Sequence, residues 1–187
     1  MSTPAKPHIY TFWLLDTTHL GLVTTWLDAP HMRETWDNSP AHREDIRCFA
    51  HGRKEPSSYF GGIFTYWIGH ADGTPHALIL TAPVKHDDDL PPLWKANLQE
   101  DTPTFSIDFG IGEASLLGQG HAAPTLTAFM DFFVAQHTVG AFFIDPSMRN
   151  PKASHVYGKA GFEVVGTFLP EKGAFLGDET HLMIKRL

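Results

Sequence analysis

Asp108 stands on a segment whose spacing could place a carboxylate beside a reacting group. Between Thr104 and Gly112, apolar side chains occupy every second position, and the positions between them hold Ser106, Asp108, Gly110 and Gly112. This period of two predicts a strand with one buried face and one polar face. Glycine weakens a strand unless a ligand or another backbone comes close, which favours a ligand beside Asp108. A solvent-exposed strand aspartate is the alternative interpretation.

The segment Gly118-Gln119-Gly120-His121-Ala122 lies between that strand and a predicted helix. The start of a helix leaves backbone N–H groups unpaired and carries partial positive charge. Glycines that let an anion approach these groups predict a pyrophosphate site. The segment is not a Walker loop, because it lacks the Gly-Lys-Ser/Thr ending. Glycines that only turn the chain are the alternative.

A third pattern follows along the chain and reads Asn150-x-x-Ala153-x-x-x-Tyr157-x-Lys159-x-Gly161-Phe162. The glycine-rich segment followed by this pattern resembles the GNAT acetyltransferase superfamily. The pyrophosphate loop of that superfamily reads Arg/Gln-x-x-Gly-x-Gly/Ala. Gly120 and Ala122 occupy the glycine and alanine positions of that loop, while Leu117 replaces the Arg/Gln.

Further segments narrow the resemblance to the branch of aminoglycoside 6′-N-acetyltransferases and hydroxylysine-type siderophore acyltransferases. They are Ile107-Asp108, Asp145-Pro146-Ser147 and the early His31-x-x-Glu34-x-Trp36. The resemblance is good from Thr104 to the end and loose before it.

The resemblance implies direct transfer of an acetyl group from acetyl-CoA to a primary amine of a small cationic substrate, without a covalent acyl-enzyme. It implies that Tyr157 donates a proton to the leaving sulfur, since a phenol with a pKa near 10 is a suitable acid. Asp108 is the expected base or ammonium-holding group. Its usual pKa, near 4, is low for a base, so electrostatic holding is the larger role unless burial raises it.

The same resemblance implies two sets of contacts. Those to acetyl-CoA are expected from Phe109, Ile111, Gly118, Gln119, Gly120, His121, Ala122, Ala123, Asn150, Lys152, Ala153 and Lys159. Those to the acceptor are expected from Asp108, Asp145, Glu34, Trp36 and Asp178, although packing or solvation also explains the last three.

Three other functions stay open: a siderophore or other small-amine acyltransferase, a catalytically silent acyl-CoA-binding module, and a protein N-terminal acetyltransferase. A homodimer is also left open. An aminoglycoside acceptor would make the protein an antibiotic-resistance enzyme.

The first half of the chain is predicted to contain three strands and two helices. The strands are Ile9–Leu15, Tyr59–Gly69 and His76–Val84, the last two joined by the turn Ala71-Asp72-Gly73. A helix capped at Asp16 carries Leu20, Val23 and Leu27, and another runs from Ser39-Pro40 to Ala50. Loops are expected over Asp28–Asn38 and His86–Pro92.

The second half alternates strands with helices. Leu126, Phe129, Met130, Phe133 and Val134 mark an amphipathic helix that tolerates Pro124 in its first turn. A strand over Ala141–Asp145 precedes a helix that begins at Asn150-Pro151 and ends at Gly161. Strands over Phe162–Phe168 and His181–Leu187 close the chain. The order predicts an α/β (α+β) fold: a single domain over 1–187 with a mixed sheet of about seven strands and about four flanking helices.

Composition agrees with a globular protein: 42% of its 187 residues are hydrophobic and 19% are charged. A formal charge of −7 without a dense basic cluster argues against nucleic acid and favours cationic partners. Cys48 is the only cysteine, which excludes an internal disulfide, and no spaced His/Cys motif predicts a metal. No apolar run is long enough for a membrane span, and no signal peptide is recognised, so we expect a cytoplasmic protein.

Overall fold

The computed structural model describes residues 8–57, 59, 62–171, 173 and 175–187. They form one mixed seven-stranded sheet in the order β1-β2-β3-β4-β5-β7-β6, which confirms the predicted fold class. Only β4 and β5 pair in parallel. The strands are β1 (Tyr10–Leu14), β2 (Thr65–Ala71), β3 (Thr74–Val84), β4 (Thr104–Ile111), β5 (Ala141–Ile144), β6 (Glu163–Phe168) and β7 (Thr180–Arg186).

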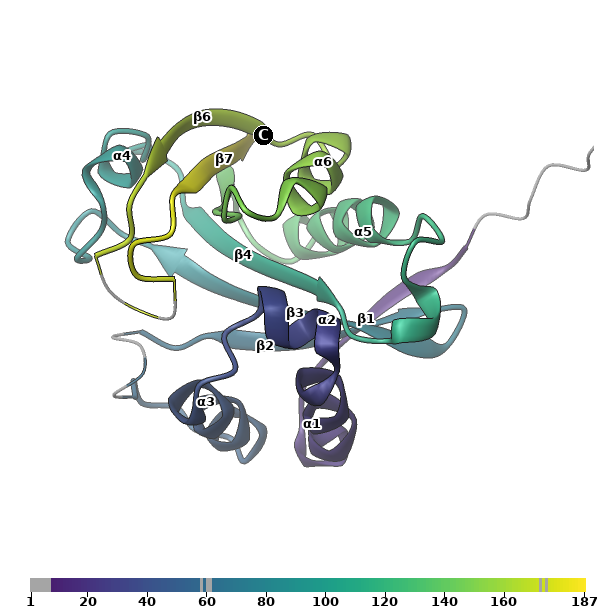
Figure 1. Cartoon of the computed structure of the whole chain (residues 1–187). Coiled ribbons are helices and arrows are strands. Elements are labelled where there is room, and N and C mark those ends of the chain that lie inside the picture. The colour runs from purple at the N-terminus through teal and green to yellow at the C-terminus, as the bar shows by residue number, and fades with distance from the viewer. Residues whose placement is uncertain (1–7, 58, 60–61, 172, 174) are drawn as a thin grey trace, which may run out of the picture.

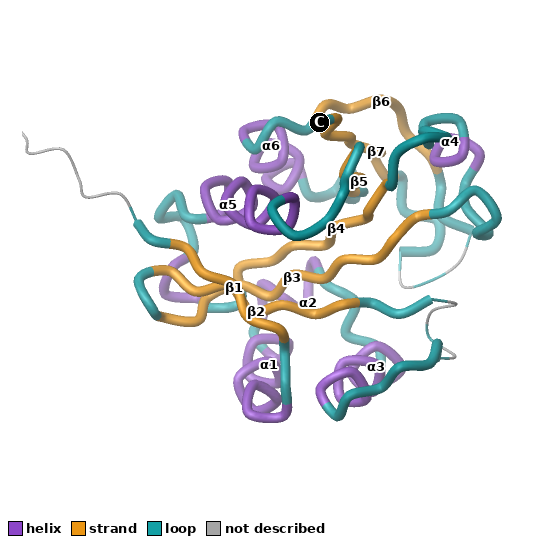
Figure 2. Tube along the Cα trace, turned by 180° about the vertical axis from the view of Figure 1, so that it is seen from behind, coloured by secondary structure: helices purple, strands orange, loops and turns teal. Residues whose placement is uncertain are grey.

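Helices cover both faces of the sheet (Figure 1 and, from behind, Figure 2). One face carries α1 (Leu20–Asp28), α2 (Pro30–Thr35) and α3 (Pro40–Ala50), and the other carries α5 (Ala122–Val134) and α6 (Pro151–Lys159). The short α4 (Pro92–Lys95) lies near β6. No helix among the described residues is long and apolar enough to cross a membrane.

Two of these helices were not predicted. The expected loop Asp28–Asn38 contains α2, where Pro30 occupies the first helical turn. Proline fixes φ near the helical value and needs no N–H partner there, so it starts a helix in a polar segment. The other, α4, also begins at a proline, Pro92, which is the last residue of the expected loop.

β2 begins later than predicted, at Thr65 instead of Tyr59. Phe60 and Gly61 lie outside the described residues. Tyr59 is not in a strand: its hydroxyl donates to Asp37 Oδ2 at 2.7 Å. The predicted turn is confirmed as Asp72 and Gly73, both with positive φ, which suits a tight hairpin.

The predicted helix ends are largely confirmed. Asp16, Ser39 and Asn150 each cap a helix with a side-chain oxygen, and Gly161 follows α6 with φ +93°. Asp16 caps a short 3-10 turn, Thr17–His19, that leads into α1. The predicted stripe of α5 is buried except for Val134, which is 40% exposed because the helix ends there.

The two faces of β4 pack as the alternation predicts. Ile107, Phe109 and Ile111 join α5 in one apolar cluster. On the other face, a Cβ at Gly110 would lie 3.2 Å from the Trp36 ring, and one at Gly112 would overlap the indole of Trp26. Tryptophan side chains therefore account for these glycines, which corrects the expectation that a ligand requires them.

Gly112→Ala is expected to destabilise the protein by about 1–3 kcal/mol, because the added methyl group overpacks against Trp26, which is buried. Gly21→Ala, at an exposed position of α1, is the matched control, since a Cβ there meets no neighbouring atom. The control should leave stability unchanged or raise it by up to about 1 kcal/mol. Urea unfolding of both variants measures the difference, and equal stabilities would refute the packing argument.

Candidate functional site

The site is built where β4 and β5 separate. Their pairing ends at Ser106 and Phe143, although β4 continues to Ile111. Asp108 and Asp145 each lie two residues beyond this last pair, on the face that Ser106 and Phe143 share. The divergence therefore leaves an open edge of β4 next to two carboxylates.

The two carboxylates affect each other electrostatically. Burial raises the pKa of Asp108 to about 6. Burial, and then the negative charge of Asp108, raise the pKa of Asp145 well above its usual value. Like charges in a shielded place disfavour double ionisation, and a cation placed between the two carboxylates would relieve this repulsion.

Tyr157 approaches the same edge from α6, on the opposite face of the sheet. It is 8% exposed, and its hydroxyl donates to the Phe109 carbonyl at 3.3 Å. Burial, followed by the charges of Asp108 and Asp145, raises the pKa of Tyr157. The open edge of β4 therefore has a phenol on one side and carboxylates on the other.

His31 of α2 contacts this edge as well, because its Nε2 lies 3.0 Å from the Ile111 carbonyl. In a strand, the N–H and C=O of one residue point to the same side. The N–H groups of Phe109 and Ile111 consequently face the opening, beyond the reach of β5.

The predicted pyrophosphate loop lies directly before α5. Gly118 and Gly120 have φ values of +74° and +83°, a conformation that favours glycine. A Cβ at either glycine would meet open space, so φ alone explains the residue type. His121, the N-cap residue of α5, makes no side-chain cap, and the Gln119 amide donates to the Ser115 carbonyl. In the described part of the chain, the His121 side chain therefore does not cap the first N–H groups of α5, which suit an anion.

A cavity of about 670 Å³ opens beside this loop. It brings together the loop, one side of α5 and the end of α6, and is lined by Gly120, Ala123, Pro124, Thr127, Ala128, Asp131 and Lys159. Three of these are predicted cofactor contacts. Its dimensions are those of a small-molecule site.

Three of the remaining predicted cofactor residues lie at the start of α6, and the fourth, Ala122, begins α5. The Asn150 side chain accepts from the Ala153 N–H at 3.1 Å, and Ala153 packs against the main apolar cluster. Lys152 is exposed. Ala122 is partly buried at the first position of α5.

The predicted acceptor contacts divide into two groups. Trp36 packs on Gly110, two residues from Asp108 on the same strand face. Glu34 is exposed on α2, and Asp178 pairs with Arg149 at 2.6 Å. The site around Asp108 therefore includes Asp145 and Trp36, whereas in the described part of the chain Glu34 and Asp178 form no hydrogen bond or ion pair with these residues.

The comparison with protein families identifies this arrangement. Residues 16–169 match the acetyltransferase (GNAT) domain. The chain belongs to this family. The match confirms the resemblance on which the sequence motifs were interpreted. No curated protein matches the sequence significantly.

Solved structures with a similar fold include acetyltransferases of two kinds. An aminoglycoside N(6′)-acetyltransferase from Legionella pneumophila has a TM-score of 0.75 and 20% identity, over 98% of this chain and 95% of that one. AAC(6′)-Ib with coenzyme A and kanamycin has a TM-score of 0.70 and 20% identity, over 95% of both chains. Spermidine N-acetyltransferase from Vibrio cholerae, with CoA and spermine, scores 0.67 at 14% identity over 95% of both.

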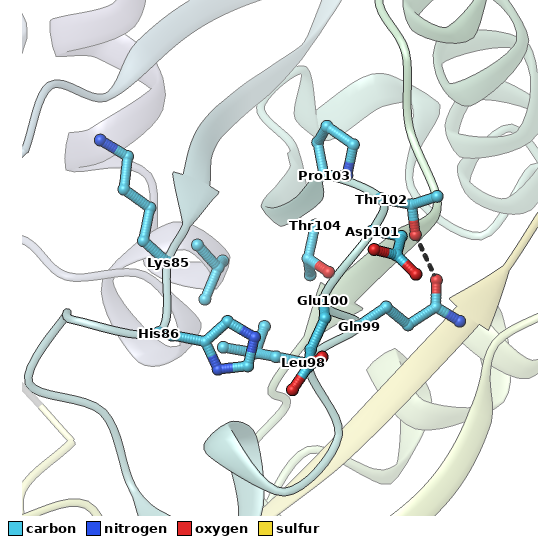
Figure 3. Close-up of a pocket in the computed structure, with 10 residues that line it drawn as sticks. Lys85, His86, Leu98, Gln99, Glu100, Asp101, Thr102, Pro103 and Thr104 are labelled. Atoms are coloured by element: carbon cyan, nitrogen blue, oxygen red, sulfur yellow. Dashed lines mark hydrogen bonds between the residues drawn. The ribbon is translucent and has the colours of Figure 1, made fainter.

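A second cavity, of about 330 Å³, lies away from the GNAT motifs (Figure 3). Lys85, His86 and the segment 98–104 line it, at the end of β3 and the start of β4. No residue predicted from the sequence to bind cofactor or acceptor lines this cavity. This cavity is therefore separate from the candidate acetyltransferase site.

Sequence reasoning missed the contact of His31 with β4, assigned no role to Asp37, and placed Tyr59 in a strand. Each forms a hydrogen bond with a residue far along the chain: His31 with the Ile111 carbonyl, and Tyr59 with Asp37. No local pattern marks such pairs. Among the described residues, no cluster of three His, Cys, Asp or Glu is arranged to hold a metal.

Proposed function

We propose that this GNAT protein is an acetyl-CoA-dependent N-acetyltransferase that transfers acetyl directly to a primary amine of a small cationic acceptor. The observation that carries the proposal is the open edge of β4, with Asp108 and Asp145 on one face and Tyr157 on the other. Two reactants that enter from opposite faces can meet at this edge.

The residues beside α5 fit a diphosphate. The start of α5 has no side-chain cap from His121, and it offers N–H groups and partial positive charge. Two glycines with positive φ precede it, and the cavity at Lys159 provides space. Gly118 to Ala123 would hold the diphosphate through the main chain, and Lys159 would face the nucleotide. Asn150, Lys152 and Ala153 would lie along the pantetheine arm. The bound acetyl-CoA supplies the thioester carbonyl and the thiolate leaving group.

Two residues of the chain carry out the proton transfers, Asp108 as the acceptor and Tyr157 as the donor. Asp108 and Asp145 hold the acceptor ammonium, and Asp108, with its raised pKa, takes up the proton directly or through water. The N–H groups of Phe109 and Ile111 donate to the carbonyl oxygen as it gains negative charge. Tyr157 donates its phenolic proton to the departing sulfur.

The acceptor class rests on charge and on the neighbouring structures. Carboxylates at the site favour a polyvalent amine, and the similar structures are aminoglycoside acetyltransferases and a spermidine N-acetyltransferase with spermine bound. An aminoglycoside is our first candidate, and its acetylation in the cytoplasm would confer antibiotic resistance. A siderophore-type hydroxylamine and a silent acyl-CoA-binding module are the competing assignments.

Two measurements test the function. Calorimetry should detect acetyl-CoA binding to the folded protein, and release of free CoA should then follow when aminoglycosides, polyamines or hydroxylamines are added. Absence of any affinity for CoA would refute the proposal. Binding without turnover on every amine would support the silent module instead.

The activity should also depend on pH. Because Asp108 has a pKa raised to about 6, it takes up a proton and loses its charge as the pH falls through that value. We expect kcat/KM for the best acceptor to decrease below about pH 6, while the Asp108→Asn variant should lack this acid limb. Rates measured between about pH 5 and 8 decide the point, and a flat wild-type profile would contradict it.

A further inference from the structure

A stack of three rings connects β4 to the segment before β2. Trp36, which packs on Gly110, lies parallel to the His42 ring at an interplanar angle of 13° and a centroid distance of 6.3 Å. His42 in turn stacks on Tyr59 at 4.7 Å and 8°. These contacts bring Tyr59 to the carboxylate face of the sheet.

Asp37 lies at the end of this stack. Its Oδ2 accepts from the Tyr59 hydroxyl at 2.7 Å, and its Oδ1 accepts from the Ser39 N–H at 2.8 Å. Burial alone would raise the pKa of Asp37, but these hydrogen bonds outweigh the effect of burial and lower the pKa. The carboxylate is therefore ionised at neutral pH, in a fixed orientation.

Asp37 forms no ion pair with a lysine or arginine among the described residues. Asp28, Asp45 and Asp178 each pair with an arginine. No such pair forms at Asp37, Asp108 or Asp145 in the described ranges. The neighbouring His42 contacts the Asp37 backbone carbonyl, and burial lowers its pKa, so it stays neutral. Among the residues that the structure describes, these three carboxylates therefore lack a protein counter-charge.

We propose that Asp37, oriented by Tyr59, is a second ammonium-binding group of the acceptor site. The inference rests on the proposed function and specifies its substrate class. The acceptor carries at least two ammonium groups: one reacts beside Asp108, and the other is held at Asp37 against the ring of Tyr59.

Two observations agree with this arrangement. The charge of Asp108 contributes to the raised pKa of Tyr59, after burial and Asp37 itself, so the two acidic positions share one electrostatic environment. An aromatic face beside a carboxylate also suits an ammonium group, because the ring quadrupole attracts a cation. A monoamine can use only one of these two positions.

The test compares diamines with monoamines of equal chain length, for example putrescine with butylamine and cadaverine with pentylamine. The readout is kcat/KM, or the inhibition constant where an amine is not acetylated. The wild type should prefer diamines by roughly tenfold or more, and Asp37→Asn should reduce this preference to about twofold. Tyr59→Phe, which keeps the ring but loses the hydroxyl, should reduce it partially.

Asp87→Asn is the matched control, because it removes the same charge from an exposed loop and should leave the preference unchanged. Rates with monoamines should change by less than about twofold in Asp37→Asn. Equal losses for monoamines and diamines would assign Asp37 a purely structural role and overturn the inference. Equal wild-type rates with both would overturn it too, while the proposed acetyltransferase activity would stand. If no amine is acetylated or bound although acetyl-CoA binds, both proposals fail.

Discussion

Asp108→Asn is expected to lower kcat/KM at least tenfold, equivalent to about 1.4 kcal/mol of transition-state stabilisation. The substitution keeps the shape of the side chain but removes the charge that holds the ammonium and the site that receives its proton. Ser106→Ala is a suitable control, since Ser106 lies on the same face of β4 within the part that still pairs with β5. A fully active Asp108→Asn variant would mean that another group manages the proton.

The same variant should make the protein more stable without ligand. Asp108 binds its proton more tightly in the folded state than in the unfolded state, because burial raises its pKa from 3.8 to about 6. Stability therefore decreases as the pH rises through this window, and the loss is complete at neutral pH. Asparagine avoids the loss, so a gain of about 1–2 kcal/mol is expected at pH 7.

Urea unfolding at two pH values measures this gain. The difference between variant and wild type should disappear as the pH is lowered to about 4, where Asp108 is protonated in the folded wild type. Lower activity together with higher stability would show that the charge serves function at the expense of the fold. Lower stability at neutral pH would show that Asp108 is a structural residue.

Tyr157→Phe is expected to reduce kcat by roughly a hundredfold, the usual contribution of a general acid. Affinity for CoA should change far less, because the ring keeps its packing beside Phe162 while only the hydroxyl is lost. The two effects separate in a comparison of kcat with the calorimetric Kd for CoA. Unchanged turnover would remove Tyr157 from the assigned role, and a parallel loss of affinity would make it a binding residue.

Local physical chemistry explains what the sequence predicted well. The alternation on β4, the helix caps at Asp16, Ser39 and Asn150, and the Asp72-Gly73 turn each depend on neighbouring residues only. Preferences for a φ value, for a capping residue and for a side-chain period can be recognised in a few consecutive residues. They were enough, with two ordered motifs, to indicate the family and the mixed sheet.

Boundaries were predicted less well where long-range contacts decide them. Tyr59 has the aromatic character of a strand residue, yet its hydrogen bond to Asp37 and its stacking on His42 hold it outside β2. The segment that became α2 is polar and short, and it is held against β4 by His31 and Trp36. Tertiary contacts overrode local preference at both places.

The sequence by itself determined the individual parts: a strand carrying Asp108, a left-handed glycine turn before α5, and a capped helix carrying Tyr157. Only the tertiary structure decided how they meet. The separation of β4 from β5 sets Asp108 beside Asp145, and the crossover to α6 brings Tyr157 to the Phe109 carbonyl. The packing of Trp36 and Trp26 explains why positions 110 and 112 are glycines. The reason is that backbone preferences act over a few residues, whereas burial and charge act between residues that are distant in sequence.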